Sequence, residues 1–180
     1  MKTKYIALFR GINVAGQNEI NLDELKAAYE ENGFTNAVCV SSGSMVFDTT
    51  MTDDARIKGK CARIIEEKFG HDILVGVLSA DELKDMMKHA PAWWDEDPLS
   101  KHRALFMIPP MTSEKAFQLG GIINPEYEKI SCWGDIIFWS APMLTLSEAR
   151  WSRIKNNKKV YDSVIVKKAT TVRQLAELTK

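Results

Sequence analysis

The sequence has few features of a secreted, membrane-spanning or strongly charged protein. Its three cysteines lie far apart and form no C-x-x-C pair, so we expect neither a disulfide framework nor a zinc knuckle. No apolar run approaches the roughly 18 residues of a membrane-spanning helix, and the first residues lack a signal-peptide pattern. The 24 basic and 24 acidic residues cancel, which argues against strong nonspecific attraction to nucleic acid or membrane. These absences predict a cytoplasmic protein without a membrane partner.

The common nucleotide-binding and catalytic fingerprints are also absent. The loop at 10–18 contains neither the G-K-[ST] of a P-loop nor G-x-G-x-x-G, and Ser42 does not lie in a G-x-S-x-G turn. His71, His89 and His102 show no metal-ligand spacing, so we expect ordinary surface or strand-end histidines and no metal site. No nucleophile, base and orienting group can be assigned together. The sequence therefore identifies neither a catalytic activity nor a cofactor.

The residues that are present describe a folded α+β protein. A hydrophobic fraction of 45% and a charged fraction of 27% are ordinary for a globular chain with a packed core. Apolar spacing, capping residues and glycines predict strands at 5–9, 37–40, 45–47 and 73–77, and helices at 21–32 and 53–69. The order strand, helix, strand, strand, helix, strand is that of the ferredoxin-like arrangement.

The second half repeats this order without a strong residue-level repeat. We expect strands at 104–108, 127–132, 136–139 and 161–166, and helices at 113–119, at 145–155 and from 171 onward. A stretch with two prolines and two adjacent tryptophans, at 91–98, interrupts regular structure, and we expect the tryptophans to pack where two domains meet rather than to stack on a ligand. The prediction is two ferredoxin-like βαββαβ domains, 1–90 and 102–180, joined by a linker at 91–101. Each has an antiparallel sheet with helices on one face.

A polar, glycine-containing loop follows the first strand and is the main candidate site. Strands one and three are antiparallel neighbours in the ferredoxin-like arrangement, so the loop beginning at Arg10 should lie beside the hairpin at 41–44 and the start of the first helix. Glycines allow close backbone approach, helix N–H groups attract anions, and arginine offers a bidentate fork. These features favour a small anionic or phosphorylated ligand. In an alternative that stays open, Asn13, Gly16 and Asn18 serve loop geometry while Arg10 pairs with a carboxylate.

A second candidate is the basic segment 149–168, which holds seven basic residues against one acidic residue, with Trp151 and Tyr161 among them. Its candidate phosphate contacts are Arg150, Arg153, Lys167 and Lys168. Together with open sheet faces, they suggest binding of single-stranded nucleic acid. The third strand, however, lacks the aromatic-rich motif of RNA-recognition sheets, and a solvated helix face also explains such a segment.

The most distinctive residues resemble a known family. The strand Y-I-A-L-F, the loop R-G-I-N-V-A-G-Q-N, the following N-L-D-E-L and the later V-S-S-G-S-M-V-F are similar to the bacterial domain-of-unknown-function family sixteen-ninety-seven. The resemblance covers nearly the whole chain and implies two α+β domains of ferredoxin-like character, without an established activity. The positions that match the family pattern are Arg10, Gly11, Asn13, Gly16, Asn18, Ser42 and Gly43.

Departures from the family pattern bear on the prediction. Ala15 and Ser44 depart from the family's R-G-I-N-V-G-G loop and S-G-N hairpin, and both changes are small. Near the carboxyl end, the family tends to carry R-N-W-N where this chain has K-K-A-T at 167–170, so a function that needs that asparagine and tryptophan is not expected here. The matching positions are the predicted ligand site. Nucleic-acid binding and a protein-interaction role are the alternatives, and the oligomeric state is open.

Overall fold

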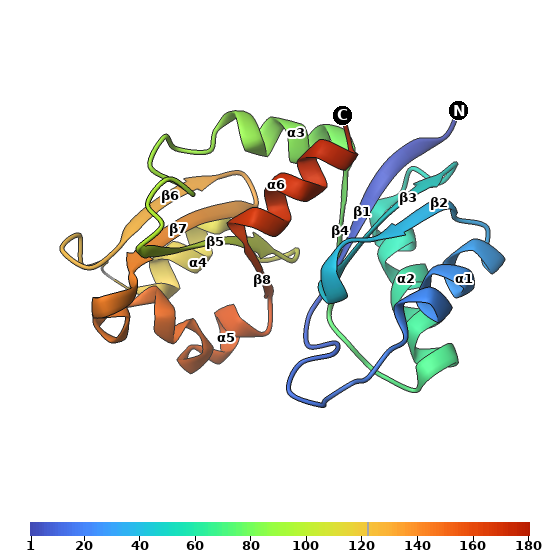
Figure 1. Cartoon of the computed structure of the whole chain (residues 1–180), viewed down its shortest axis with the longest axis horizontal. Helices are drawn as coiled ribbons and strands as arrows, with labels where there is room; N and C mark the ends of the chain where they lie inside the picture. The colour runs from blue at the N-terminus through green and yellow to red at the C-terminus, as the bar shows by residue number, and fades with distance from the viewer. Residues whose placement is uncertain (122) are drawn as a thin grey trace. The chain divides into compact units, whose positions relative to one another are not determined.

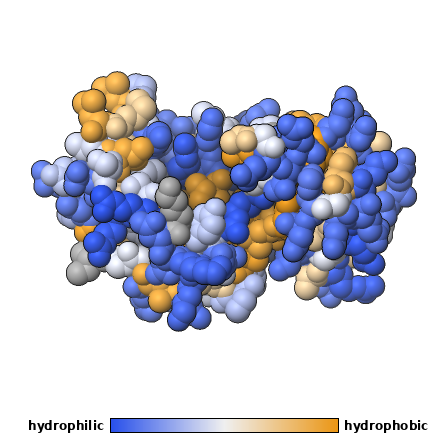
Figure 2. Space-filling view, turned by 90° about the horizontal axis from the view of Figure 1, so that it is seen from below, coloured by the Kyte–Doolittle hydropathy of each residue, from blue (hydrophilic) through white to orange (hydrophobic). Residues whose placement is uncertain are grey.

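The structure, a computed structural model, shows a mixed α+β protein. It describes residues 1–121 and 123–180, and for Ser42 and Lys155 it describes the backbone alone. Both sheets have four antiparallel strands, which confirms the predicted fold class. No helix within the described residues is long and apolar enough to cross a membrane. The face seen in Figure 2 is mostly hydrophilic, with hydrophobic residues in scattered patches.

The chain divides into two compact units. One comprises Met1–Lys84 together with Arg173–Lys180, and the other comprises Asp85–Val172. The residues predicted as a linker, 91–101, belong to the second unit. The carboxyl-terminal residues, 173–180, belong to the first. The predicted domain bounds, 1–90 and 102–180 with a linker at 91–101, stay a prediction.

The first unit has the ferredoxin-like element order (Figure 1). Its strands and helices are β1 (Thr3–Phe9), α1 (Leu22–Glu31), β2 (Thr35–Cys39), β3 (Ser44–Thr49), α2 (Asp54–Phe69) and β4 (Val75–Ser79). The strands lie in the order β2-β3-β1-β4. A short 3₁₀ turn, η1 (Ser41–Gly43), connects β2 to β3. The apolar first strand is therefore central, where its composition predicts it.

Local sequence signals begin and end the helices of this unit. At the start of α1, the Asn21 side chain accepts hydrogen bonds from the N–H groups of Asp23 and Glu24 at 2.9 and 3.2 Å. Asp53 caps α2 in the same way, and such caps satisfy N–H groups that have no partner within the helix. Gly70 ends α2 in the left-handed conformation, with φ 72°, which glycine adopts without a Cβ clash.

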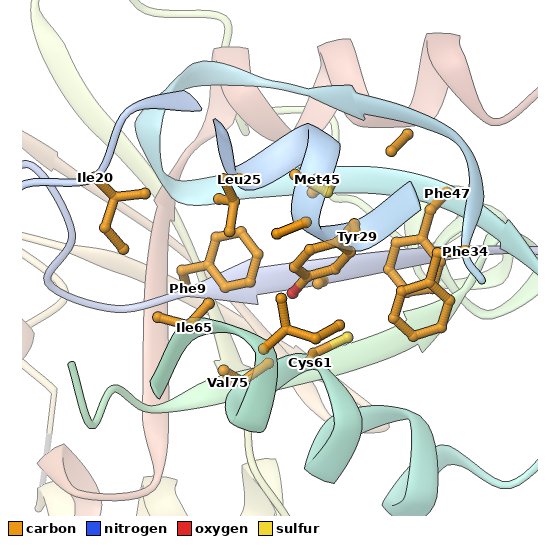
Figure 3. Close-up of a cluster of buried hydrophobic side chains, with 14 of the residues drawn as sticks. Phe9, Ile20, Leu25, Tyr29, Phe34, Met45, Phe47, Cys61, Ile65 and Val75 are labelled. Carbon is orange, nitrogen blue, oxygen red and sulfur yellow. The ribbon is translucent and has the colours of Figure 1, made fainter. Parts of the chain in front are cut away.

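Helices α1 and α2 cover one face of the first sheet. Aromatic rings fill the layer between the helices and the sheet (Figure 3). The Tyr29 ring lies edge-on to Phe9 and Phe47, with centroid separations of 6.3 and 5.7 Å. The Phe34 ring is tilted against Phe47 at 4.3 Å. Such pairs stabilise a core beyond the apolar area that they bury. The residues of β1 that point to the other face of the sheet are buried as well.

The second unit repeats the strand order of the first. Its strands and helices are β5 (Ser100–Met107), α4 (Ser113–Gly120), β6 (Lys129–Trp133), β7 (Ile136–Pro142), α5 (Lys158–Tyr161) and β8 (Val164–Lys168). The strands lie in the order β6-β7-β5-β8. Along the chain, α3 (Ala80–Lys88) precedes these elements and α6 (Ala169–Leu178) follows them. The last strand begins later than the predicted 161, and the closing helix begins earlier than the predicted 171.

The helix predicted at 145–155 is wrong. Two 3₁₀ helices take its place, η2 (Met143–Glu148) and η3 (Trp151–Asn156). The expected cap at Thr145 does not form, because its hydroxyl is buried and has no hydrogen-bond partner among the described residues. The N–H groups of Arg150 and Trp151, which an α-helix would direct at carbonyls four residues earlier, donate instead to the carboxylate of Glu128.

Glu128 is the buried carboxylate that shapes this part of the second unit. Its side chain is 3% exposed. The N–H groups of Arg150 and Trp151 donate to it at 3.0 Å. The indole N–H of Trp139 donates at 2.9 Å and the N–H of Asn124 at 3.3 Å. A buried carboxylate is tolerated only when it is hydrogen-bonded in this manner, so Glu128 joins β7 to the segment that begins η3.

Lys167 is a buried cation on β8. It is 9% exposed, and burial lowers the pKa of its ammonium group to about 8. The next residue, Lys168, is exposed. Because burial disfavours the charged form of an amine, the charge on Lys167 reduces the stability of the folded chain at neutral pH.

We expect Glu128→Ala to lower the free energy of unfolding by about 3–5 kcal/mol, because four N–H donors would lose their shared acceptor. Glu128→Gln retains one acceptor oxygen and should cost about half as much. Urea unfolding measures both effects. The control for the loss of a carboxylate is Glu126→Gln, at an exposed position two residues earlier. This variant should change the free energy of unfolding by less than about 0.5 kcal/mol. Equal, small effects of all three variants would contradict the role of the buried carboxylate.

We expect Lys167→Met to stabilise the protein near neutral pH, by roughly 1–3 kcal/mol. The folded-state pKa of Lys167 lies below its unfolded value, so the wild type gains stability as the pH rises from about 8 toward the unfolded pKa. The advantage of the variant should therefore shrink at about pH 9.5. Urea unfolding at both pH values measures the change, with the exposed Lys168→Met as control. An advantage of the same size at both pH values would count against the buried charge.

Candidate functional site

The loop after β1 forms a compact hairpin of its own. Positive φ angles occur at Gly11 (79°), Asn13 (51°), Ala15 (50°), Gly16 (74°) and Asn18 (47°). The consecutive values at Ala15 and Gly16 suit the tight turns that close β-hairpins, and the N–H of Gln17 donates to the carbonyl of Val14 at 2.9 Å. Glycine and asparagine tolerate this backbone region best, which explains their recurrence in the loop.

The side chains of Asn13 and Asn18 hold the loop together. The amide nitrogen of Asn13 donates to the carbonyl of Ile20 at 2.9 Å, and its oxygen accepts the N–H of Ile20 at 2.8 Å. The amide nitrogen of Asn18 donates to the carbonyl of Gly11 at 2.9 Å. These bonds favour the loop-geometry interpretation of both asparagines. Their role as ligand contacts stays a prediction.

Arg10 lies at the end of β1, in a corner with the β2–β3 connection. Leu8 pairs with Ser44 across the two strands, so the chain that leaves β1 runs beside the turn Ser41–Gly43. On the other side, the N–H of Arg10 donates to the carbonyl of Leu74 at 3.1 Å. The Arg10 side chain is half-buried. The antiparallel pairing thus brings Arg10 and the hairpin together, as the topology predicts.

The hairpin contributes a buried hydroxyl to this corner. Ser44 is 1% exposed, and its hydroxyl has no hydrogen-bond partner among the described residues. The N–H of Val40 donates to the carbonyl of Ser44 at 2.8 Å, and Ser41 has a φ of 54°. Gly43 is half-buried, and the side chain of the predicted Ser42 lies outside the described residues. Because a buried hydroxyl without a partner is costly, Ser44 is a functional candidate that the sequence prediction did not include.

The start of α1 lies at the same end of the sheet but offers less to an anion than expected. The Cys39 thiol, at the end of β2, donates to the carbonyl of Leu22 at 3.4 Å. The Asn21 side chain already accepts the N–H groups of Asp23 and Glu24. These two acidic side chains also offset the positive end of the helix dipole. The expectation that unpaired N–H groups of this helix attract an anion is therefore wrong for the two that Asn21 caps.

A shallow hollow lies on the flank of the loop, and its lining includes Gly16 but not Arg10. The hollow measures about 380 Å³, and its lining residues are Asn13, Gly16, Glu19, Ile20 and Asn21. Its only charged lining residue is Glu19 among those described. A carboxylate repels an anionic ligand, so this hollow does not suit the predicted ligand.

The basic residues of the carboxyl-terminal segment do not share one surface. Lys167 is buried and Lys168 is exposed, and successive residues of a strand point to opposite faces. Arg150 and Arg153 are exposed and line a hollow of about 460 Å³, which also contains the carboxylate of Glu148. The residues on the helix-free face of the second sheet are largely buried. Nucleic-acid binding through these residues stays a prediction.

A buried histidine near the start of β5 was expected at the surface or at a strand end. His102 is 9% exposed, and its Nε2 lies 2.7 Å from the carbonyl of Asp97. Its Nδ1 lies 3.0 Å from the N–H nitrogen of Asp95 and 2.5 Å from the hydroxyl oxygen of Ser140. Since a backbone N–H can only donate, Nδ1 accepts and Nε2 carries the proton. The alternation of β5, which puts His102 on the face of Ala104, is the signal that would have predicted its burial.

The thiols are poor nucleophiles in this fold. Burial raises the pKa of Cys61 to about 12. It also raises the pKa of Cys39 and of Cys132. A thiol reacts as the thiolate, so these cysteines stay protonated and unreactive near neutral pH. In the ranges that the structure describes, no three His, Cys, Asp or Glu side chains gather closely enough to hold a metal ion.

Comparison with known proteins places this fold and loop in a family. Residues 1–138 match the family described as "Protein of unknown function (DUF1697)". The solved structure of the conserved bacterial protein SP0830 from Streptococcus pneumoniae is 21% identical, covers 100% of both chains and has a TM-score of 0.85, which shows a shared fold. An unknown protein from Galdieria sulphuraria aligns over 93% of this chain and 97% of its own, at 11% identity and a TM-score of 0.28.

The match to the Galdieria sulphuraria protein has a TM-score too low to show a shared fold. No curated protein matches the sequence significantly. The family match covers the β1 loop, the hairpin, and the second sheet as far as the start of β7. The chain therefore belongs to the DUF1697 family of proteins of unknown function.

Proposed function

We propose that the first unit binds a small anionic or phosphorylated compound at the corner formed by Arg10 and the hairpin 41–44. The observation that carries the proposal is the hydroxyl of Ser44, which is buried and has no partner among the described residues. This hydroxyl lies across from Leu8, the last residue of β1 paired with β3. A ligand oxygen placed there would accept its hydrogen bond and remove the cost of burying it unpaired.

The position of Arg10 supports an anionic ligand. Arg10 follows Leu8 by two residues, which is the spacing of side chains on one face of a strand, so its guanidinium is expected on the face of Ser44. A guanidinium presents its N–H groups in a planar fork that matches phosphate and carboxylate oxygens. Gly76 pairs with Leu8 from the other side and adds no side chain to this row. The proposed ligand therefore accepts hydrogen bonds from one neutral and one charged donor.

The cysteines support a location in the cytoplasm for this binding module. Cys39, Cys61 and Cys132 are all unpaired, and free thiols are typical of proteins in reducing compartments. The ligand is accordingly expected among soluble intracellular anions.

Thermal-shift measurements with inorganic phosphate, pyrophosphate and nucleoside monophosphates should reveal stabilisation by at least one of these anions. A ligand at about 100 times its Kd adds about 2.7 kcal/mol to the free energy of unfolding, if it binds only the folded state. Arg10→Ala should weaken the affinity about tenfold or more, since it removes a charged hydrogen-bond donor. Arg63→Ala removes the same charge from an exposed position of α2 and should leave the shift unchanged.

Ser44→Ala tests the corner in a second way. In the ligand-free protein, the variant removes a buried hydroxyl without a described partner, so its melting temperature should be unchanged or higher. The stabilisation by the anion should nevertheless fall. The proposal fails if no anion stabilises the protein, or if wild type, Arg10→Ala and Ser44→Ala respond equally.

A further inference from the structure

The second unit contains a cavity lined by aromatic and basic side chains. It has a volume of about 290 Å³, at the lower end of the range for small-molecule sites. It lies between the sheet face that carries Trp139 and the 3₁₀ segment that carries Trp151. Lys101 and Arg103 supply its charged groups, and Tyr161 adds a third aromatic ring. The cavity is distinct from the Arg10 corner, because all of its lining residues belong to the second unit.

The basic residues of this cavity have no acidic counterpart. Arg103 is half-buried, and burial lowers the pKa of its guanidinium. Its hydrogen bond within the described residues is to the carbonyl of His102, at 3.1 Å. Neither Lys101 nor Arg103 forms an ion pair with a described residue, and the cavity lining includes no carboxylate. A partly buried cation without a counter-charge is unfavourable, and an anionic ligand would supply that charge.

The aromatic walls are held in place before any ligand binds. The indole N–H of Trp139 and the backbone N–H of Trp151 both donate to Glu128. The rings of Phe117 and Trp151 are stacked, with centroids 6.4 Å apart. Trp151 also packs so closely on Gly120 that a Cβ there would lie 2.8 Å from its ring. A cavity of fixed shape lowers the entropy cost of binding.

The cavity is also open to solvent, and one of its lining residues has a buried polar group without a partner among the described residues. Tyr161 and Val166, each 40% exposed, lie at its mouth. Trp151 is 4% exposed, and its indole N–H has no partner among the described residues. Buried indole N–H groups ordinarily find an acceptor. An open mouth is a property of a binding site rather than of a closed core.

We propose that this cavity binds a small planar aromatic anion. The ring of the ligand packs against Trp139 and Trp151, and its carboxylate or phosphate accepts hydrogen bonds from Arg103. Aromatic side chains favour a flat apolar ring, and a guanidinium favours a planar carboxylate or a phosphate. The combination predicts that a ligand needs both parts, and that an anion without a ring or a ring without a charge binds poorly.

Isothermal titration with naphthoate, neutral naphthalenemethanol and inorganic phosphate tests this requirement on the full chain carrying Arg10→Ala, in which the anion corner proposed for the first unit is weakened. Naphthoate should bind about tenfold or more tightly than either of the other two. Arg103→Met keeps the apolar stem and removes the charge, so it should weaken naphthoate binding about tenfold or more. Lys129→Met removes a charge from an exposed position of β6 and should have no effect. Naphthoate should bind the wild type and the Arg10→Ala chain with equal affinity, which separates this site from the corner in the first unit.

Two further variants keep the test decisive if Arg103→Met does not fold. Tyr161→Ala changes an exposed residue at the mouth and should weaken naphthoate binding without unfolding the unit. Trp151→Phe identifies the indole N–H signal of Trp151 in nitrogen-15 spectra, and naphthoate should shift that signal in the wild type. The proposal is overturned if naphthoate does not bind, if the neutral analogue or phosphate binds the Arg10→Ala chain as tightly as naphthoate does, or if Arg103→Met and Tyr161→Ala bind naphthoate like the wild type.

Discussion

The burial of each central strand on both faces is the constraint on which the rest of the structure depends. Consecutive residues in the second half of β1 and of β5 are buried, so both faces of each strand are covered. Each strand is also hydrogen-bonded at both edges, β1 to β3 and β4, and β5 to β7 and β8. A strand covered on both sides must be apolar along its middle, so charged groups are confined to its ends. Both proposed sites lie where a central strand becomes polar: Arg10 follows the end of β1, and Lys101 and Arg103 lie in the first half of β5.

Polar side chains give the irregular segments around these strands their shape. Asn13 pairs with both backbone groups of Ile20 and so closes the loop that leaves β1. Glu128 takes the N–H groups of Arg150 and Trp151 and so prevents a continuous helix between β7 and β8. In both places a side chain takes the role of a backbone hydrogen-bond partner. Backbone N–H and carbonyl groups in buried or turning segments need such a partner when no strand or helix supplies one. The same contacts position the neighbouring candidate sites.

The order of the elements and the ends of several helices could be predicted from the sequence. Apolar spacing and caps such as Asn21 and Asp53 act over a few residues, so a local pattern contains the necessary information. The prediction failed at 145–155, where Thr145 resembles a cap. The decisive interaction there comes from Glu128, which is distant in the chain and carries no local signal for its role.

The sequence by itself determined the two ferredoxin-like element orders, the polar loop after β1 and its meeting with the hairpin, because antiparallel pairing follows from the order of the strands. Only the tertiary structure decided which polar groups lack partners and which charges are buried. The hydroxyl of Ser44, the ammonium of Lys167 and the guanidinium of Arg103 have ordinary neighbours in the sequence. Their burial depends on side chains that fold over them from distant parts of the chain, and no local pattern contains that information.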